Sequence, residues 1–172
     1  MAMGVMPTDP NKIPKMADLV ETLKSYKLKD VRTYIQSGNI LLESNLSHAE
    51  LATKIHDIIV KEIGANLSVI IKTKKDFETS INENPFDDSY DFSRIHLVFT
   101  NNDLDELKIK KIKETAFEGE IFSVGTECFY MYLPRDSAKK KLNNNYLERQ
   151  LKIVATTRKL SVTKKLHSML DN

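Results

Sequence analysis

The stretch TYIQSGNIL places polar or small residues, among them Ser37, Gly38 and Asn39, between apolar and β-branched runs. This pattern predicts a β-hairpin with Ser37-Gly38 at its tip. In one interpretation the tip is only a turn, for which Gly38 supplies a positive φ. In the other, the Ser37 hydroxyl, the Asn39 amide and exposed backbone N–H groups bind an anion. The residues leave both interpretations open.

A second polar segment, ATTRK at residues 155–159, precedes an amphipathic pattern near the end of the chain. We expect Thr156 and Thr157 at the N-terminus of the last helix, where they can cap it or offer hydroxyls to an anion. Arg158 can form a two-pronged contact with a phosphate or a carboxylate. The alternative is an N-cap followed by a surface arginine.

No complete catalytic set accompanies these segments. The histidines are scattered, without the spacing of metal ligands, and Cys128 is the only cysteine. Phosphate-binding glycine loops and nucleophile motifs are also missing from the sequence. We therefore predict no metal and no cofactor, and whether the chain is an enzyme is left open. The histidines are His48, His56, His96 and His167.

The bulk composition is that of an ordinary globular protein. The chain has 172 residues, of which 41% are hydrophobic and 29% charged, with a formal net charge of +2. No apolar run approaches the ~20 residues that span a bilayer. The N-terminus does not have the pattern of a secretory signal, so we expect a cytoplasmic protein without a membrane partner.

Charge is unevenly distributed along the chain. From Pro134 onward there are ten Lys or Arg residues against three Asp or Glu. Such a segment is either a solvated basic face or a patch that attracts a phosphorylated metabolite or a nucleic acid.

The order of predicted elements repeats. Each half runs helix, hairpin, helix, with a strand on at least one side. We therefore predict an α+β fold of two packed ferredoxin-like subdomains of the β-α-β-β-α-β type. The turn-rich segment NPFDDSYDFS supplies the boundary, giving subdomains at 1–86 and 87–172, the second with an extra C-terminal helix.

Local signals fix some details of these elements. Ser47 and Glu50 have capping-box spacing at the start of a helix that ends at Gly64. A two-residue tip in the first hairpin would place Ile35 opposite Ile40. In the second hairpin, a tip at Gly125-Thr126 would place Phe122 opposite Phe129.

Three stretches together resemble the DUF1697 family, bacterial proteins of unknown function. They are NKIPKMADL (11–19), VRTYIQSGNILLES (31–44) and KLNNNYLERQLKIVATTR (141–158). The resemblance implies two ferredoxin-like subdomains. The family pattern opens with an apolar strand, whereas only Met1 and Ala2 precede Met3 here, so we expect the first subdomain to lack most of its opening strand. The resulting unpaired sheet edge would favour a homo-oligomer, or coverage of the edge by residues 1–12.

The family-like stretches also contain Lys12 and Lys141, which would suit a phosphate-bearing ligand together with Ser37 and Arg158. Our hypothesis is that these segments converge on one site. There the protein would bind, or bind and transform, a small anionic or phosphorylated ligand.

The alternative is a nucleic-acid or protein interaction module that uses the sheet and the basic C-terminal region. Alternation in CFYMYL places Tyr130 and Tyr132 on one face of a strand. RNA-recognition modules stack bases on such exposed aromatic residues.

Overall fold

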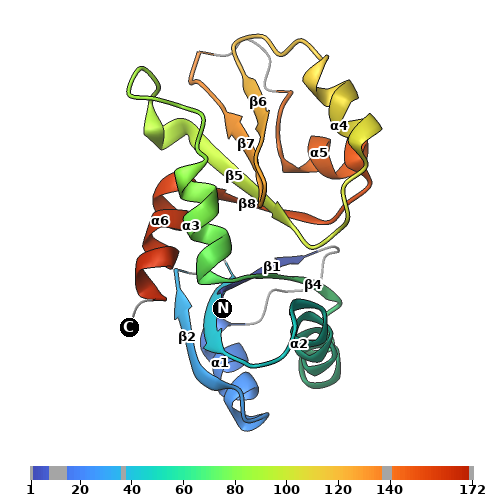
Figure 1. Ribbon diagram of the computed structural model, residues 1–172. Coiled ribbons are helices and arrows are strands. Elements are labelled where there is room, and N and C mark those ends of the chain that lie inside the picture. The colour runs from blue at the N-terminus through green and yellow to red at the C-terminus, as the bar shows by residue number, and fades with distance from the viewer. Residues whose placement is uncertain (1, 8–14, 36–37, 137–140, 171–172) are drawn as a thin grey trace. The chain divides into compact units, whose positions relative to one another are not determined.

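The computed structural model describes residues 2–7, 15–35, 38–136 and 141–170 (Figure 1). Contacts divide the chain into two units, residues 1–74 with 170–172 and residues 75–169. Each unit contains one four-stranded sheet. The fold is α+β, as the sequence predicted, whereas the proposed boundary after residue 86 stays a prediction.

The first unit follows the order β-α-β-β-α-β. Its strands form an antiparallel sheet in the order β2-β3-β1-β4. The elements are β1 (Ala2–Pro7), α1 (Met16–Ser25), β2 (Lys29–Tyr34), β3 (Asn39–Glu43), α2 (His48–Ile63) and β4 (Leu67–Lys72).

The opening strand is present, so the expectation that most of it is missing was wrong. β1 pairs with β3 on one side and with β4 on the other. Six residues are enough for a strand of ordinary length, and residues 2–7 provide them. Because β1 is internal to the sheet, the unpaired edge that motivated the homo-oligomer prediction does not arise there.

One face of the first sheet packs against α1 and α2. The core includes Leu19 and Leu23 of α1, Leu51 and Ile55 of α2, and Ile40 of β3. Side chains at alternate strand positions reach this core, as the period of a strand requires.

The capping box predicted for α2 is confirmed. The Ser47 hydroxyl accepts from the Glu50 backbone N–H, and the Glu50 carboxylate accepts from the Ser47 backbone N–H. Gly64 ends the helix in the left-handed conformation. These caps satisfy backbone groups that a helix terminus otherwise leaves unpaired.

The second unit contains a sheet with the same order of strands, β6-β7-β5-β8. Here α3 precedes the β-α-β-β-α-β run and α6 follows it. The elements are α3 (Lys74–Asn82), the 3-10 helix η1 (Phe92–Arg94), β5 (Ile95–Thr100), α4 (Glu106–Lys113), β6 (Ile121–Val124), β7 (Phe129–Tyr132), α5 (Asn144–Leu151), β8 (Ala155–Lys159) and α6 (Leu160–Met169).

Helices cover both faces of the second sheet (Figure 1). On one face, Val98 and Phe129 pack with Leu147 of α5 in a buried cluster. On the other, the rings of Phe99 and Phe77 of α3 meet edge to face, with centroids 5.5 Å apart. Because both faces are covered, this sheet offers no open platform.

Both hairpins differ in register from the prediction. Tyr34 pairs with Asn39, and Val124 pairs with Phe129. Each connection therefore spans four positions, 35–38 and 125–128, rather than two. The shift of two residues preserves which side chains share a face, because the strand period is two.

Candidate functional site

The structure distributes the predicted site residues over both units. Gly38 and Asn39 belong to the first unit, and the Lys141 and 156–158 positions belong to the second. Lys12 and Ser37 lie outside the described residues. Each group is considered within its own unit, and the hypothesis that they share one site stays a prediction.

In the first hairpin, Asn39 closes the connection between the strands. Its side chain is 1% exposed, and Nδ2 donates to the Tyr34 carbonyl oxygen at 3.2 Å. Gly38 has a φ of +76°, and Ile35, at the other end of the connection, has a φ of +52°. These features support the turn interpretation of Gly38 and Asn39, because both residues serve the geometry of the connection.

The ATTRK segment is a strand and not the start of a helix, so this part of the prediction was wrong. β8 pairs antiparallel with β5, placing Thr157 opposite Val98 and Arg158 opposite Leu97. The last helix, α6, begins only at Leu160. β-branched threonines suit a strand, and β8 supplies the partner for a free side of β5. Thr156 and Thr157 therefore do not cap α6.

Side chains of α5 hold the backbone of β8. Thr157 Oγ1 donates to Asn144 Oδ1 at 2.8 Å, and Asn144 Nδ2 donates to the Ala155 carbonyl oxygen at 3.3 Å. The Ala155 N–H donates to Glu148 Oε1 at 2.8 Å. Thr157 thus faces α5 and anchors the strand.

Arg158 projects from the opposite face of β8 to Thr157. Its Nη1 donates to Thr156 Oγ1 at 2.7 Å and to the Thr157 carbonyl oxygen at 2.9 Å. The side chain is half-buried, and desolvation lowers the pKa of its guanidinium. The group nevertheless stays protonated at neutral pH, because an arginine guanidinium is not deprotonated in proteins. The result is a fixed cation on a strand.

Lys141 lies in a different environment. Its Nζ is 5.6 Å from the Phe117 ring centroid and 5.7 Å from that of Tyr146, within the range of cation–π contacts. Its backbone N–H donates to Oε2 of Glu120, a carboxylate that is only 5% exposed.

The structure does not bring Lys141 to Arg158. Tyr146 and Phe117 pack with Val98 on the α4–α5 face of the sheet. Arg158 pairs with Leu97, the neighbour of Val98, and therefore projects from the opposite face.

The tyrosines of β7 do not form a base-stacking surface. Tyr130 is 1% exposed, and its hydroxyl donates to the Ser80 carbonyl oxygen of α3 at 2.7 Å. The Tyr132 ring packs against Phe86 and Tyr90, with centroids 5.7 and 5.0 Å away. The platform that motivated the nucleic-acid alternative is therefore occupied by the protein itself.

A groove that sequence reasoning missed lies along α2 in the first unit. It has a volume of about 650 Å³, within the range of ligand pockets, and Tyr26 forms one wall. The α2 side chains that line it are Ala49, Glu50, Thr53, Lys54, Asp57, Ile58 and Lys61.

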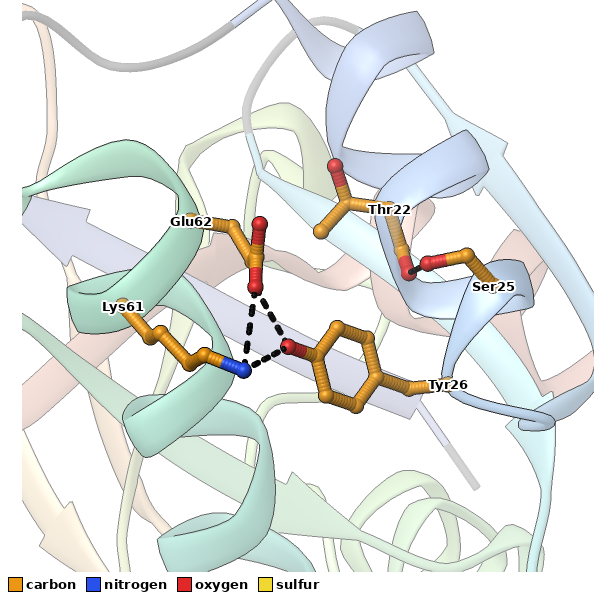
Figure 2. Close-up of polar contacts among 5 residues, drawn as sticks. All are labelled: Thr22, Ser25, Tyr26, Lys61 and Glu62. Atoms are coloured by element: carbon orange, nitrogen blue, oxygen red, sulfur yellow. Dashed lines mark hydrogen bonds and ion pairs between the residues drawn. The ribbon is translucent and has the colours of Figure 1, made fainter.

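Tyr26 joins the two last charged residues of α2 (Figure 2). Its hydroxyl donates to Glu62 Oε1 and accepts from Lys61 Nζ at 2.9 Å. These bonds raise the pKa of Lys61 and lower the pKa of Glu62, so both side chains are charged at neutral pH. The partners are 35 and 36 residues apart in sequence, so no local pattern could have predicted this network.

The described residues contain neither a cluster of metal ligands nor a membrane-spanning helix. Within ranges 2–7, 15–35, 38–136 and 141–170, no group of three or more His, Cys, Asp or Glu residues could hold a metal ion. No helix in these ranges is long and apolar enough to cross a membrane.

Comparison with known proteins identifies relatives but no activity. The family described as "Protein of unknown function (DUF1697)" matches residues 3–130. A solved structure of the conserved bacterial protein SP0830 from Streptococcus pneumoniae is similar, with a TM-score of 0.74 and 24% identity. That match covers 99% of this chain and 97% of the other. No curated protein matches the sequence.

Proposed function

The chain belongs to the DUF1697 family of proteins of unknown function, and within that frame we propose that its second unit binds a small anionic ligand at Arg158. The ligand class is a phosphate or a phosphate-bearing metabolite. The proposal covers binding and names no reaction.

The observation that carries this proposal is the fixed position of the guanidinium. Two hydrogen bonds from Nη1, to Thr156 Oγ1 and the Thr157 carbonyl oxygen, orient the planar group. Both of these acceptors are uncharged oxygens, and together they fix the plane of the guanidinium beside the strand. A guanidinium held in this way has lost its rotamer freedom before a ligand arrives, which favours binding.

The partly desolvated setting adds to the attraction. Burial disfavours the charged form of Arg158, and an anion beside the guanidinium would offset that effect. The planar fork of an arginine matches the oxygen geometry of phosphate in a two-pronged contact. Thr157 contributes indirectly, because its bond to Asn144 holds the strand.

The other residues that the sequence predicts to bind the ligand are not part of this site. The prediction for Lys12, Ser37, Gly38 and Asn39 concerns the first unit, and the site proposed at Arg158 does not include them. Lys141 is not included in the proposed site, because its ammonium lies over Phe117 and Tyr146 on the other side of the sheet.

The experiment is a titration of the full chain with inorganic phosphate at low ionic strength, followed by amide NMR. We expect saturable shifts around β8 in the wild type. Arg158→Gln should weaken binding by about tenfold or more, because it removes charge-assisted hydrogen bonds. Arg158→Lys should retain part of the affinity, since an ammonium keeps the charge but not the fork.

The matched control is Arg149→Gln, which removes an exposed arginine of α5. It should bind phosphate like the wild type. Thermal unfolding monitors the fold of each variant. Absence of saturable shifts in the wild type, or equal affinity in a folded Arg158→Gln variant, would refute the proposal.

A further inference from the structure

The exposed face of α2 carries four charged residues at helical spacing, Glu50, Lys54, Asp57 and Lys61. All four are exposed and line the groove beside Tyr26. Intervals of four, three and four residues place them along one side of the helix. We call this set the charge stripe.

The signs of the charge stripe alternate from negative to positive along the helix. An identical helix laid antiparallel, with a twofold axis between positions 54 and 57, would reverse that order. Glu50 would then face Lys61 of the second copy, and Lys54 would face Asp57 of the second copy. A parallel arrangement in register would place like charges together. The charge stripe is therefore complementary to itself in one orientation, as a twofold interface requires.

The outer charges of the stripe are held in place by their own unit. Glu50 accepts from the backbone N–H and hydroxyl of Ser47, and these bonds lower its pKa. Lys61 is held by Tyr26 and Glu62 (Figure 2). Lys54 and Asp57, next to the proposed axis, have no side-chain hydrogen bond or ion pair within the described parts of the chain.

Apolar surface flanks the charge stripe. Val60 is 44% exposed and follows Asp57 by three residues on the same side of α2. Ala49 and Thr53 are also exposed there, whereas Ile58, which also lines the groove, is buried in the core of the first unit. These groups offer apolar contact alongside the charges.

We propose that the charge stripe and its apolar flank form a docking surface for a second copy of this chain, with the two α2 helices antiparallel. A helix of 16 residues is about 24 Å long. Such a contact is smaller than the ~800 Å² per partner of a stable dimer, so association is weak and reversible. The charges determine orientation and salt dependence more than affinity.

Sedimentation equilibrium of the full chain, at up to about 1 mM protein, tests the proposal. The wild type should associate at low salt and less at about 0.5 M salt, where exposed charges are screened. Lys54→Glu and Asp57→Lys should each reduce association by about tenfold or more, because both inner pairs become like-charged.

Two combinations distinguish this geometry from a general charge effect. Mixing the Lys54→Glu chain with the Asp57→Lys chain restores both inner pairs and should give a heterodimer. The double variant carrying both changes in one chain should associate like the wild type. The matched control is Lys113→Glu, the same charge reversal on an exposed lysine of α4, which should leave association unchanged.

Circular dichroism establishes that each variant is folded. A wild type that stays monomeric at low salt would overturn the proposal. Association that survives both single reversals, or that is not restored on mixing, would overturn it equally.

Discussion

The two hairpin connections of this protein occupy the same place in two units with the same strand order, yet they are held differently. In the first, Asn39 Nδ2 donates to the Tyr34 carbonyl oxygen, a bond within the hairpin itself. In the second, the Gly125 N–H donates to the Cys128 carbonyl oxygen at 2.9 Å. A residue outside the hairpin also forms hydrogen bonds with this connection.

That residue is Glu83, which directly follows α3. Its Oε2 accepts from the Thr126 backbone N–H and its Oε1 accepts from the Thr126 hydroxyl, both at 2.7 Å. Tyr130, two residues beyond Cys128, bonds to the Ser80 carbonyl oxygen of the same helix. The second connection is therefore coupled to α3, whereas the described contact of Asn39 is local.

Among the variants that test this difference, Gly125→Ala should cause the largest loss of stability. A Cβ at this position would lie 2.7 Å from Tyr130 Cε2 and 3.0 Å from Glu83 Oε2. Relief requires movement of the buried Tyr130 ring, so we expect a loss of about 2–3 kcal/mol in the free energy of unfolding. Urea unfolding measures it.

Gly64→Ala is the matched control for Gly125→Ala. Gly64 has a φ of +74° and open space around it, so alanine there brings backbone strain of about 1 kcal/mol without a clash. A Gly125→Ala variant no less stable than Gly64→Ala would show that the second connection is not tightly coupled to α3.

The next effect is expected for Asn39→Ala. The change removes a buried donor from the Tyr34 carbonyl oxygen, which should lower the free energy of unfolding by about 1–2 kcal/mol. Amide hydrogen exchange should accelerate in β2 and β3 and stay unchanged in β6 and β7. Acceleration in both hairpins would break the distinction between local and external closure.

Glu83→Gln should have the smallest effect, since this carboxylate is exposed to solvent. The Thr126 bonds lower the pKa of Glu83, so its contribution to stability is present above its usual pKa and is lost as pH falls. The difference in unfolding midpoint between Glu83→Gln and wild type should therefore shrink from pH 7 to about pH 3.5.

The control is Glu114→Gln, at the exposed C-cap residue of α4, whose ion pair with Lys110 is long at 3.9 Å. A Glu83→Gln difference that does not depend on pH would argue against a role for the ionised carboxylate.

Sequence reasoning succeeded where the determining interactions are local. The α2 capping box needed only Ser47 and Glu50, three residues apart, and the structure confirms it. The order of elements was likewise readable from periodicity. The hairpin registers were wrong because the small residues suggested two-residue tips. A shift of two keeps the faces, so apolar pairing could not reveal the error, and Ile35 is in fact 49% exposed.

Long-range contacts explain the other failures. The polar segment ATTRK forms a strand, although its composition does not indicate one. Its partner β5 lies more than 50 residues earlier in the chain. The sequence also did not reveal that the Lys141 ammonium lies over the rings of Phe117 and Tyr146, at 5.6 and 5.7 Å from their centroids. The role of Arg158 in a ligand site stays a prediction, and the orientation of its side chain could not be foreseen because it depends on the pairing of β8 with β5.

The buried Tyr130 hydroxyl also has an optical consequence. The chain contains no tryptophan and six tyrosines, so its near-ultraviolet absorbance reports on tyrosine. Burial raises the pKa of Tyr130 well above the usual value of about 10. Its phenolate absorbance in alkali therefore emerges only as the sheet opens, and stability declines as pH rises beyond the ordinary tyrosine pKa. Among the six tyrosines, Tyr130 thus reports the separation of β7 from α3.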